Sequence, residues 1–350
     1  MAAGRLDALR ALCAVAEGAT VRRRGAEPAA ASDPDSAAAA DCVVTVLGDD
    51  LHRLCVTGGR QDMPRSLGSV LGGSVVRYLF GFRGKLSRAV TTPVVCCTGI
   101  GGLAISRDGS SLLVSDRVSS SSGIHELRAA DGTHLRTIGA HGSGLLHFDQ
   151  PWQVYIAHDD FAFVAEFYNH RVQVLTPGRD FYGFVGVGQL RFPSGVCADK
   201  DSVFVCERDA HRLSVFRRSD GVLLRRFGSL GSGDGQLYAP FGVCLIGTGP
   251  EIAVVDNGNN RISVFTVQGA FVRHVGVGDL DYPAAVTCSE GDDGLVVADN
   301  GNRRVAMFSA CGKLVKTMDC GLVVGVATHG EAVFAQITSF RSCEKNIMFT

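Results

Sequence analysis

One twelve-residue pattern occurs four times in this chain and constrains its fold more than any other feature. Aligned on an arginine, the copies read VAEFYNHRVQVL (164–175), VCERDAHRLSVF (205–216), VVDNGNNRISVF (254–265) and VADNGNRRVAMF (297–308). In each copy an acidic residue stands five positions before the arginine, giving the pairs Glu166–Arg171, Glu207–Arg212, Asp256–Arg261 and Asp299–Arg304. Self-similarity at a period of about 40 to 50 residues is the signature of a repeat architecture. We therefore predict that the pattern is structural and turns one strand into the next.

The rest of each repeat predicts three further strands. Each unit opens with proline and an apolar run: PWQVYIA from residue 151, PSGVCAD from 193, PFGVCLI from 240 and PAAVTCS from 283. A second strand ends at the acidic residue, a third begins after the arginine, and a fourth precedes a connector such as GQLYAP or GDLDYP. Four short strands with turn signals every 8 to 12 residues or so are typical of one blade of a β-propeller.

The expected fold is therefore all-β, a β-propeller of four-stranded antiparallel blades. We expect six blades, with seven as the alternative, over approximately residues 93–147, 148–192, 193–239, 240–282, 283–320 and 321–350. The last segment contains three strand-like runs, VVGVATH, AVFAQI and NIMFT. We expect an N-terminal strand within residues 75–86 to complete that blade and close the ring, which would leave no sheet edge open.

Residues 1–40 differ in character from the propeller segment 41–350. They are rich in alanine and arginine, which predicts a flexible tail, with a short amphipathic helix over LDALRALCAVAEG as an option. Several acidic residues argue against a mitochondrial transit peptide: Asp7, Glu17, Glu27, Asp33 and Asp35. The sequence leaves open whether this segment is a tail, a targeting segment or an incorrect start.

Composition is consistent with a globular, β-rich chain. The 44 glycines and a hydrophobic content of 46% suit short strands joined by tight turns. A net charge of −1 gives no overall electrostatic signature of a nucleic-acid-binding protein. The chain has 12 cysteines but no C-x-x-C pair, and it has no long apolar run. We therefore expect reduced thiols, a cytoplasmic location and no membrane span.

The repeat resembles the NHL repeat. The resemblance rests on the acidic strand end, the N-x-N-R-[VI] turn, the V-x-V-F strand and the G-x-L-x-x-P-x-G-V connector, and it covers roughly residues 93–330. It implies a β-propeller that serves as an interaction module, because NHL-type propellers bind peptides or read RNA. Related six-bladed propellers include metal-dependent lyases and lactonases, so the resemblance is specific for the fold and weak for function.

Binding residues are expected on one face of the propeller. Strands within a blade alternate in direction, so the loop after the second strand and the connector before the next proline share a face, which we call the loop face. Its variable positions mix aromatic, basic and amide side chains, which suits a peptide or single-stranded RNA. The binding candidates are Tyr168, His170, Arg208, His211, Asn257, Asn259, Asn302 and Arg303. The acid–arginine residues are instead assigned a structural role, with the arginine bonding its acid or nearby carbonyls.

The favoured function is a non-catalytic, cofactor-free, monomeric scaffold that binds a protein or peptide through the loop face. RNA binding through the same face is the first alternative. It requires positive potential, which is reduced by acidic residues on that face: Glu166, Glu207, Asp209 and Asp279.

A metal-dependent lyase or hydrolase is the second alternative. It would draw on His134, His141, His147 and His170, which lack H-x-H or H-x-x-x-H spacing. We therefore predict no metal site and no catalytic residue. Trp152, the single tryptophan, heads an innermost strand, where core packing and a ligand platform both stay open.

Overall fold

The computed structural model describes residues 100–337 except 119–121, 248, 290 and 292, together with the backbone of five earlier strands. The chain divides into two compact units, residues 1–71 and 72–350. The first unit contains a three-stranded sheet of β1 (Thr20–Arg23), β2 (Val43–Val46) and β3 (Leu54–Thr57). The central strand β2 pairs in parallel with β1 and antiparallel with β3. The helix predicted near the N-terminus lies outside the described residues, and the boundary predicted at residue 41 stays a prediction.

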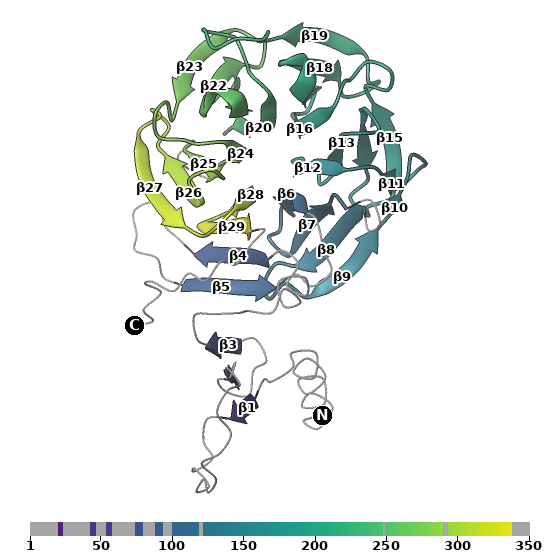
Figure 1. Ribbon diagram of the computed structural model, residues 1–350. Coiled ribbons are helices and arrows are strands. Elements are labelled where there is room, and N and C mark those ends of the chain that lie inside the picture. The colour runs from purple at the N-terminus through teal and green to yellow at the C-terminus, as the bar shows by residue number, and fades with distance from the viewer. Residues whose placement is uncertain are drawn as a thin grey trace, which may run out of the picture. The chain divides into compact units, whose positions relative to one another are not determined.

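The second unit is a β-propeller with four-stranded antiparallel blades (Figure 1). Five blades are each formed by four consecutive strands, with the first strand innermost and the fourth outermost. Their strands are β6 (Ile100–Ile105), β7 (Ser111–Asp116), β8 (Gly123–Arg128) and β9 (His134–Ile138); β12 (Pro151–Ile156), β13 (Ala162–Glu166), β14 (Arg171–Leu175) and β15 (Phe181–Val185); β16 (Pro193–Ala198), β17 (Ser202–Glu207), β18 (Arg212–Arg217) and β19 (Leu223–Phe227); β20 (Pro240–Ile246), β21 (Glu251–Asp256), β22 (Arg261–Thr266) and β23 (Phe271–Val275); β24 (Pro283–Cys288), β25 (Leu295–Asp299), β26 (Arg304–Phe308) and β27 (Leu314–Asp319).

A further four-stranded sheet joins two distant segments of the chain. Its strands, in order, are β28 (Val323–His329), β29 (Ala332–Ile337), β4 (Ser74–Leu79) and β5 (Arg88–Pro93). The strand predicted within residues 75–86 takes part as β4, but a second N-terminal strand, β5, joins it, where a single one was predicted. Five blades of consecutive strands, and not the predicted six or seven, are thus established. The predicted strand NIMFT lies outside the described residues.

The hydrophobic core lies between neighbouring sheets. The second strand of each consecutive blade is buried almost throughout, because both of its faces are covered by other sheets. The third strands contribute large apolar side chains that are at most 1% exposed: Leu127, Leu175, Phe216, Phe265 and Phe308. Phe216, for example, packs against Phe163 and Val172 of the preceding blade. Burying such a side chain contributes about 1.5–3 kcal/mol, so these contacts fix the spacing of the blades.

Minor elements lie in the loops. The connector after β9 holds a two-stranded parallel sheet of β10 (Ala140–His141) and β11 (His147–Phe148). Two loops contain single 3₁₀ turns, η1 (Arg208–Ala210) and η2 (Asn257–Asn259). None of the helices in the described part of the chain has the length and hydropathy needed to span a bilayer.

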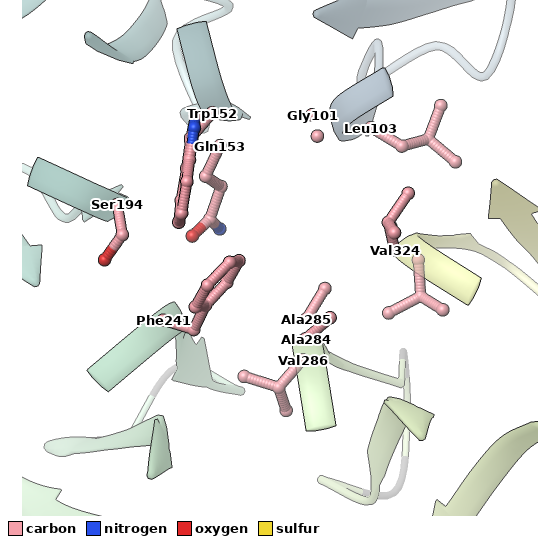
Figure 2. Close-up of a pocket in the computed structure, with 14 residues that line it drawn as sticks. Gly101, Leu103, Trp152, Gln153, Ser194, Phe241, Ala284, Ala285, Val286 and Val324 are labelled. Carbon is pink, nitrogen blue, oxygen red and sulfur yellow. The ribbon is translucent and has the colours of Figure 1, made fainter. Parts of the chain in front are cut away.

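The innermost strands surround a narrow channel. Figure 2 shows Trp152, Gln153 and Phe241 extending into it from their strands. The Gln153 carboxamide donates to the carbonyl of Val243 (3.0 Å) and accepts from the amides of Val196 (3.2 Å) and Val243 (3.1 Å). It occupies space left by glycine on other strands, since a Cβ at Gly195 would lie 2.9 Å from its Oε1. The cavity that remains is about 30 Å³, enough for a few water molecules only.

Candidate functional site

The acid–arginine motif forms an ion pair in four blades. The arginine Nε lies 2.8 Å from the carboxylate in Glu166–Arg171 and Asp256–Arg261, 2.9 Å in Glu207–Arg212 and 2.7 Å in Asp299–Arg304. All four carboxylates are completely buried. Burial is the main effect on Glu166 and raises its pKa, while the bonds from Arg171 and Asn169 act in the opposite direction. The arginine thus supplies a charged donor to an acid that has no access to water.

The same pair holds the connector that leads into its blade. The Asp256 carboxylate accepts the backbone N–H of Tyr238 (2.7 Å), and Asp299 accepts that of Asp281 (2.9 Å). The Arg261 guanidinium donates to the carbonyls of Gly233 (3.3 Å) and Gln236 (3.4 Å). The loop and the connector therefore lie side by side, as the strand order requires.

The residue before each motif arginine has a left-handed backbone. The φ angles are 52°, 53°, 55° and 56° for His170, His211, Asn260 and Arg303. Three of these side chains accept a backbone N–H from the following connector: Phe192 N–H to His170 Nδ1 (3.1 Å), Ala239 N–H to His211 Nδ1 (3.0 Å) and Tyr282 N–H to Asn260 Oδ1 (2.9 Å). An accepting Nδ1 carries no proton, so both imidazoles have their proton on Nε2. His170 and His211, predicted to bind a ligand, are bonded within the propeller.

The amides predicted to bind a ligand also form internal hydrogen bonds. Asn257 donates to the carbonyl of Pro283 (2.9 Å). Asn259 donates to Asp256 (2.9 Å) and to the carbonyl of Gly231 (2.8 Å), and Asn302 donates to Asp299 (2.9 Å) and to the carbonyl of Asp279 (3.1 Å). Their role in binding stays a prediction, but their amide groups already serve the turn.

Three of the predicted binding residues remain more accessible. The Tyr168 side chain is 50% exposed. Arg208 forms an ion pair with the adjacent Asp209 (3.2 Å), and Arg303 is exposed. The structure brings Tyr168 and Arg208 toward one place, the channel mouth, whereas Arg303 lies in the loop between β25 and β26.

An aromatic and cationic cluster surrounds Trp152 at the mouth of the channel. The indole stacks on Phe167 with ring centroids 4.4 Å apart and 11° between the planes, and Phe241 approaches it at 4.4 Å. The guanidinium carbons of Arg117 and Arg208 lie 4.8 and 6.0 Å from the indole centroid. Phe192 packs on Phe167 at 4.9 Å. We call these residues the Trp152 cluster: Arg117, Trp152, Phe167, Phe192, Arg208 and Phe241.

Three members of the cluster occupy one repeat position. Arg117, Phe167 and Arg208 each follow the acidic residue that ends the second strand of their blade. The sequence analysis missed Arg117 because its copy of the motif has Gly123 where the arginine should stand, opposite Asp116. Aligning the repeats on the acid instead of the arginine would have found it.

The blade that lacks the motif arginine uses a histidine instead. Asp116 is fully buried, and His125 Nε2 lies 3.6 Å from its carboxylate. His125 Nδ1 lies 3.0 Å from the hydroxyl of Thr137. An imidazole from the third strand therefore approaches the acid from the position that glutamine or serine occupies in the neighbouring blades.

The histidines considered for a metal site have separate partners. His134 bonds Thr137 (3.0 Å), His147 bonds the carbonyl of Leu145 (2.9 Å), and His141 lies 4.0 Å from Asp149. Within the described residues, no group of three or more histidine, cysteine, aspartate or glutamate side chains could hold a metal ion.

Known proteins resemble this chain in part. No family model matches it. It is 31% identical over 110 residues to the protein brain tumor of Drosophila melanogaster and 32% identical over 136 residues to the RING finger protein nhl-1 of Caenorhabditis elegans. These segments cover 30% and 36% of this chain and 10% and 13% of the relatives, so the chain spans about a tenth of the length of the curated relatives it matches.

Solved structures share the fold. A chain of the nidogen/laminin complex is 17% identical with a TM-score of 0.55, covering 73% of this chain and 98% of that one. A streptogramin B lyase is 9% identical with a TM-score of 0.50, covering 76% of this chain and 98% of that one. The predicted propeller is thereby confirmed.

Replacing Arg261 with alanine is expected to lower the free energy of unfolding by about 1–3 kcal/mol, because Asp256 stays buried and loses its charged donor. Urea denaturation measures the change. Arg303→Ala, at an exposed position, is the control and should change it by no more than about 0.5 kcal/mol. Wild-type stability in Arg261→Ala would contradict the structural role.

His211→Asn is expected to keep the thermal stability of the wild type, since Asn260 performs the same task in the next blade. In His211→Ala the free energy of unfolding should fall by about 1–3 kcal/mol, because the Ala239 N–H is left without its acceptor. An equal loss in both variants would assign the effect to packing of the imidazole on Tyr238, 5.6 Å away, instead of to the hydrogen bond.

Proposed function

Because the chain is built from NHL-type repeats, we propose that it is a non-catalytic scaffold that binds a protein or peptide through its loop face. The observation that carries this proposal is the exposure of aromatic side chains where most polar side chains are bonded internally. Tyr168, Tyr238 and Tyr282, all in loop-face segments, are 50%, 49% and 61% exposed. Tyrosine and tryptophan are enriched in protein interfaces and among the few residues that carry most of the binding energy.

The charge of the loop face favours a protein partner over RNA. Arg117, Arg208 and Arg303 are accompanied on this face by Asp209 and Asp279, so the two signs are mixed. RNA affinity depends on several phosphate contacts, each weakened by a nearby carboxylate. RNA is the second candidate because exposed aromatic rings can also stack on bases.

The described residues offer little to the metal-dependent lyase or hydrolase. The channel cavity of about 30 Å³ is far smaller than the roughly 300–1,000 Å³ typical of a small-molecule site. Gln153 lines this cavity, and three hydrogen bonds to Val196 and Val243 occupy its carboxamide. Binding on the surface of the loop face therefore suits this geometry better than catalysis inside the channel.

We propose a monomer in the cytoplasm. Cys197, Cys206 and Cys244 are free and buried, and burial raises the pKa of each thiol. Such thiols are protonated small apolar side chains that suit a reducing compartment.

We also propose that β4 and β5 complete a sixth blade and close the ring. β4 lies between β29 and β5, paired antiparallel with both. The same sheet also packs against the blade that begins with β6. A hydrophobic cluster that includes Leu103, Val114 and Phe334 joins β28 and β29 to that blade. Both contacts are what a closing blade requires.

Val76→Pro is expected to lower the melting temperature of the whole propeller, because proline in a central strand removes a ladder hydrogen bond. Val76 is paired with Ala335 of β29 and Thr91 of β5. Val44→Pro, in the sheet of the first unit, is the control and should leave the main transition in place. If the melting temperature of Val76→Pro were unchanged, β4 and β5 would not form part of the ring, and the propeller would have five blades.

Selection of binders on the full chain tests the scaffold proposal, with a random peptide library and a random single-stranded RNA library used in parallel. We expect enriched peptides, whose affinity falls at least about tenfold in Tyr168→Ala or Tyr238→Ala. Tyr182→Ala is the matched control, because that tyrosine is 62% exposed but lies on the outer strand β15. Enriched RNA with steeply salt-dependent affinity, and no enriched peptide, would overturn the proposal in favour of RNA.

A further inference from the structure

We propose that the Trp152 cluster binds a carboxylate side chain of an acidic peptide, held between Arg117, Arg208 and the indole N–H. The inference rests on the proposed function of the loop face and specifies its partner: a segment with an aspartate or glutamate beside apolar residues.

The first argument is a cation without an anion. Arg117 forms no hydrogen bond or ion pair with any described residue, and its contact is with the face of the Trp152 ring at 4.8 Å. Desolvation lowers the pKa of Arg117, and the nearby Tyr168 acts in the opposite direction. A partly buried charge without a counter-ion costs free energy, which a bound anion would recover.

The second argument is a set of donors without acceptors. Trp152 Nε1, Arg117 Nε and Arg208 Nε are buried and have no hydrogen-bond partner among the described residues. The Trp152 side chain as a whole is 9% exposed. Buried donors are rarely left unpaired in folded proteins. Indole and guanidinium groups only donate, so the missing component is an acceptor, and a carboxylate supplies two oxygens with about four acceptor sites.

The third argument comes from the same repeat position in other blades. Asn257 and Asn300 also follow the motif acid, and their amides donate to the carbonyls of Pro283 (2.9 Å) and Val323 (2.7 Å). The fold thus has a way to satisfy this position internally. Arg117 and Arg208 do not use it, and they lie in the two blades on either side of the Trp152 blade. Among the five consecutive blades, the departure from the repeat at this position is confined to the residues around one indole ring.

The surroundings favour a peptide over a polyanion. Phe167, Phe192 and Phe241 provide an apolar floor that suits side chains next to the carboxylate. Asp209, paired with Arg208, would repel a run of phosphates more strongly than a single carboxylate. Tyr168, half exposed and packed edge-on against Phe167 at 5.3 Å, offers a further contact at the margin.

The single tryptophan of the chain makes the site directly observable. Full-length protein is titrated with two pools of acetylated, amidated hexapeptides, one with aspartate fixed at the third position and the other with asparagine there. We expect the aspartate pool to change the Trp152 emission at concentrations about tenfold lower than the asparagine pool, the difference given by a charge-assisted pair. In Arg117→Gln and Arg208→Gln the aspartate advantage should disappear. Arg217→Gln should keep it, because that arginine is 49% exposed but lies at the end of β18 opposite the loop face.

Stability separates this role from a structural one. Because Arg117 has no described anionic partner, Arg117→Gln should unfold at the wild-type urea concentration or above it, and a folded variant that keeps the aspartate advantage would overturn the proposal. An equal change of the Trp152 emission with the two peptide pools would also overturn the proposal. An octamer of uridylate is titrated in parallel, and a change of the emission with this RNA alone would overturn the proposal as well. If peptides selected on the loop face bind without changing the Trp152 emission, this inference fails and the scaffold function stands.

Discussion

A buried ion pair, repeated from blade to blade, is the interaction on which the propeller depends. An isolated carboxylate could not remain charged in this interior, and the paired arginine both neutralises it and reaches the carbonyls of the connector. Strand end, loop and connector are thereby fixed by one group of hydrogen bonds.

This arrangement explains why the loop face is less available to ligands than its polarity suggests. Left-handed residues such as His211 and Asn260 carry side chains that join one blade to the next connector. The residue directly after the acid behaves differently. An asparagine there donates a hydrogen bond to a backbone carbonyl of the propeller, as Asn257 does, whereas an arginine or phenylalanine contacts Trp152.

The sequence predicted the consecutive blades but not the Trp152 cluster, for physical reasons. The blades are determined by local sequence patterns, namely the apolar strands and the acid–arginine turn. Strands β12 to β27 therefore follow the expected order. The pairing of β29 with β4 joins segments far apart in the chain and has no local signature. The Trp152 cluster assembles side chains from several blades, and Arg117 belongs to a copy that lacks the arginine used for alignment. Most of the predicted site residues were polar, and polarity alone does not distinguish a binding group from one bonded internally, as Asn259 shows.

The sheet of β28, β29, β4 and β5, which joins both ends of the propeller segment, also sets an order of events during synthesis. β4 and β5 leave the ribosome before any of the five consecutive blades, yet β4 cannot meet β29 until residue 337 has been added. At ordinary elongation rates that interval is about 10 to 50 s. For that time one edge of β4 is unpaired next to a growing array of folded blades, a state open to pairing with other chains. Among the first strands made, β4 and β5 are thus among the last to reach their final sheet.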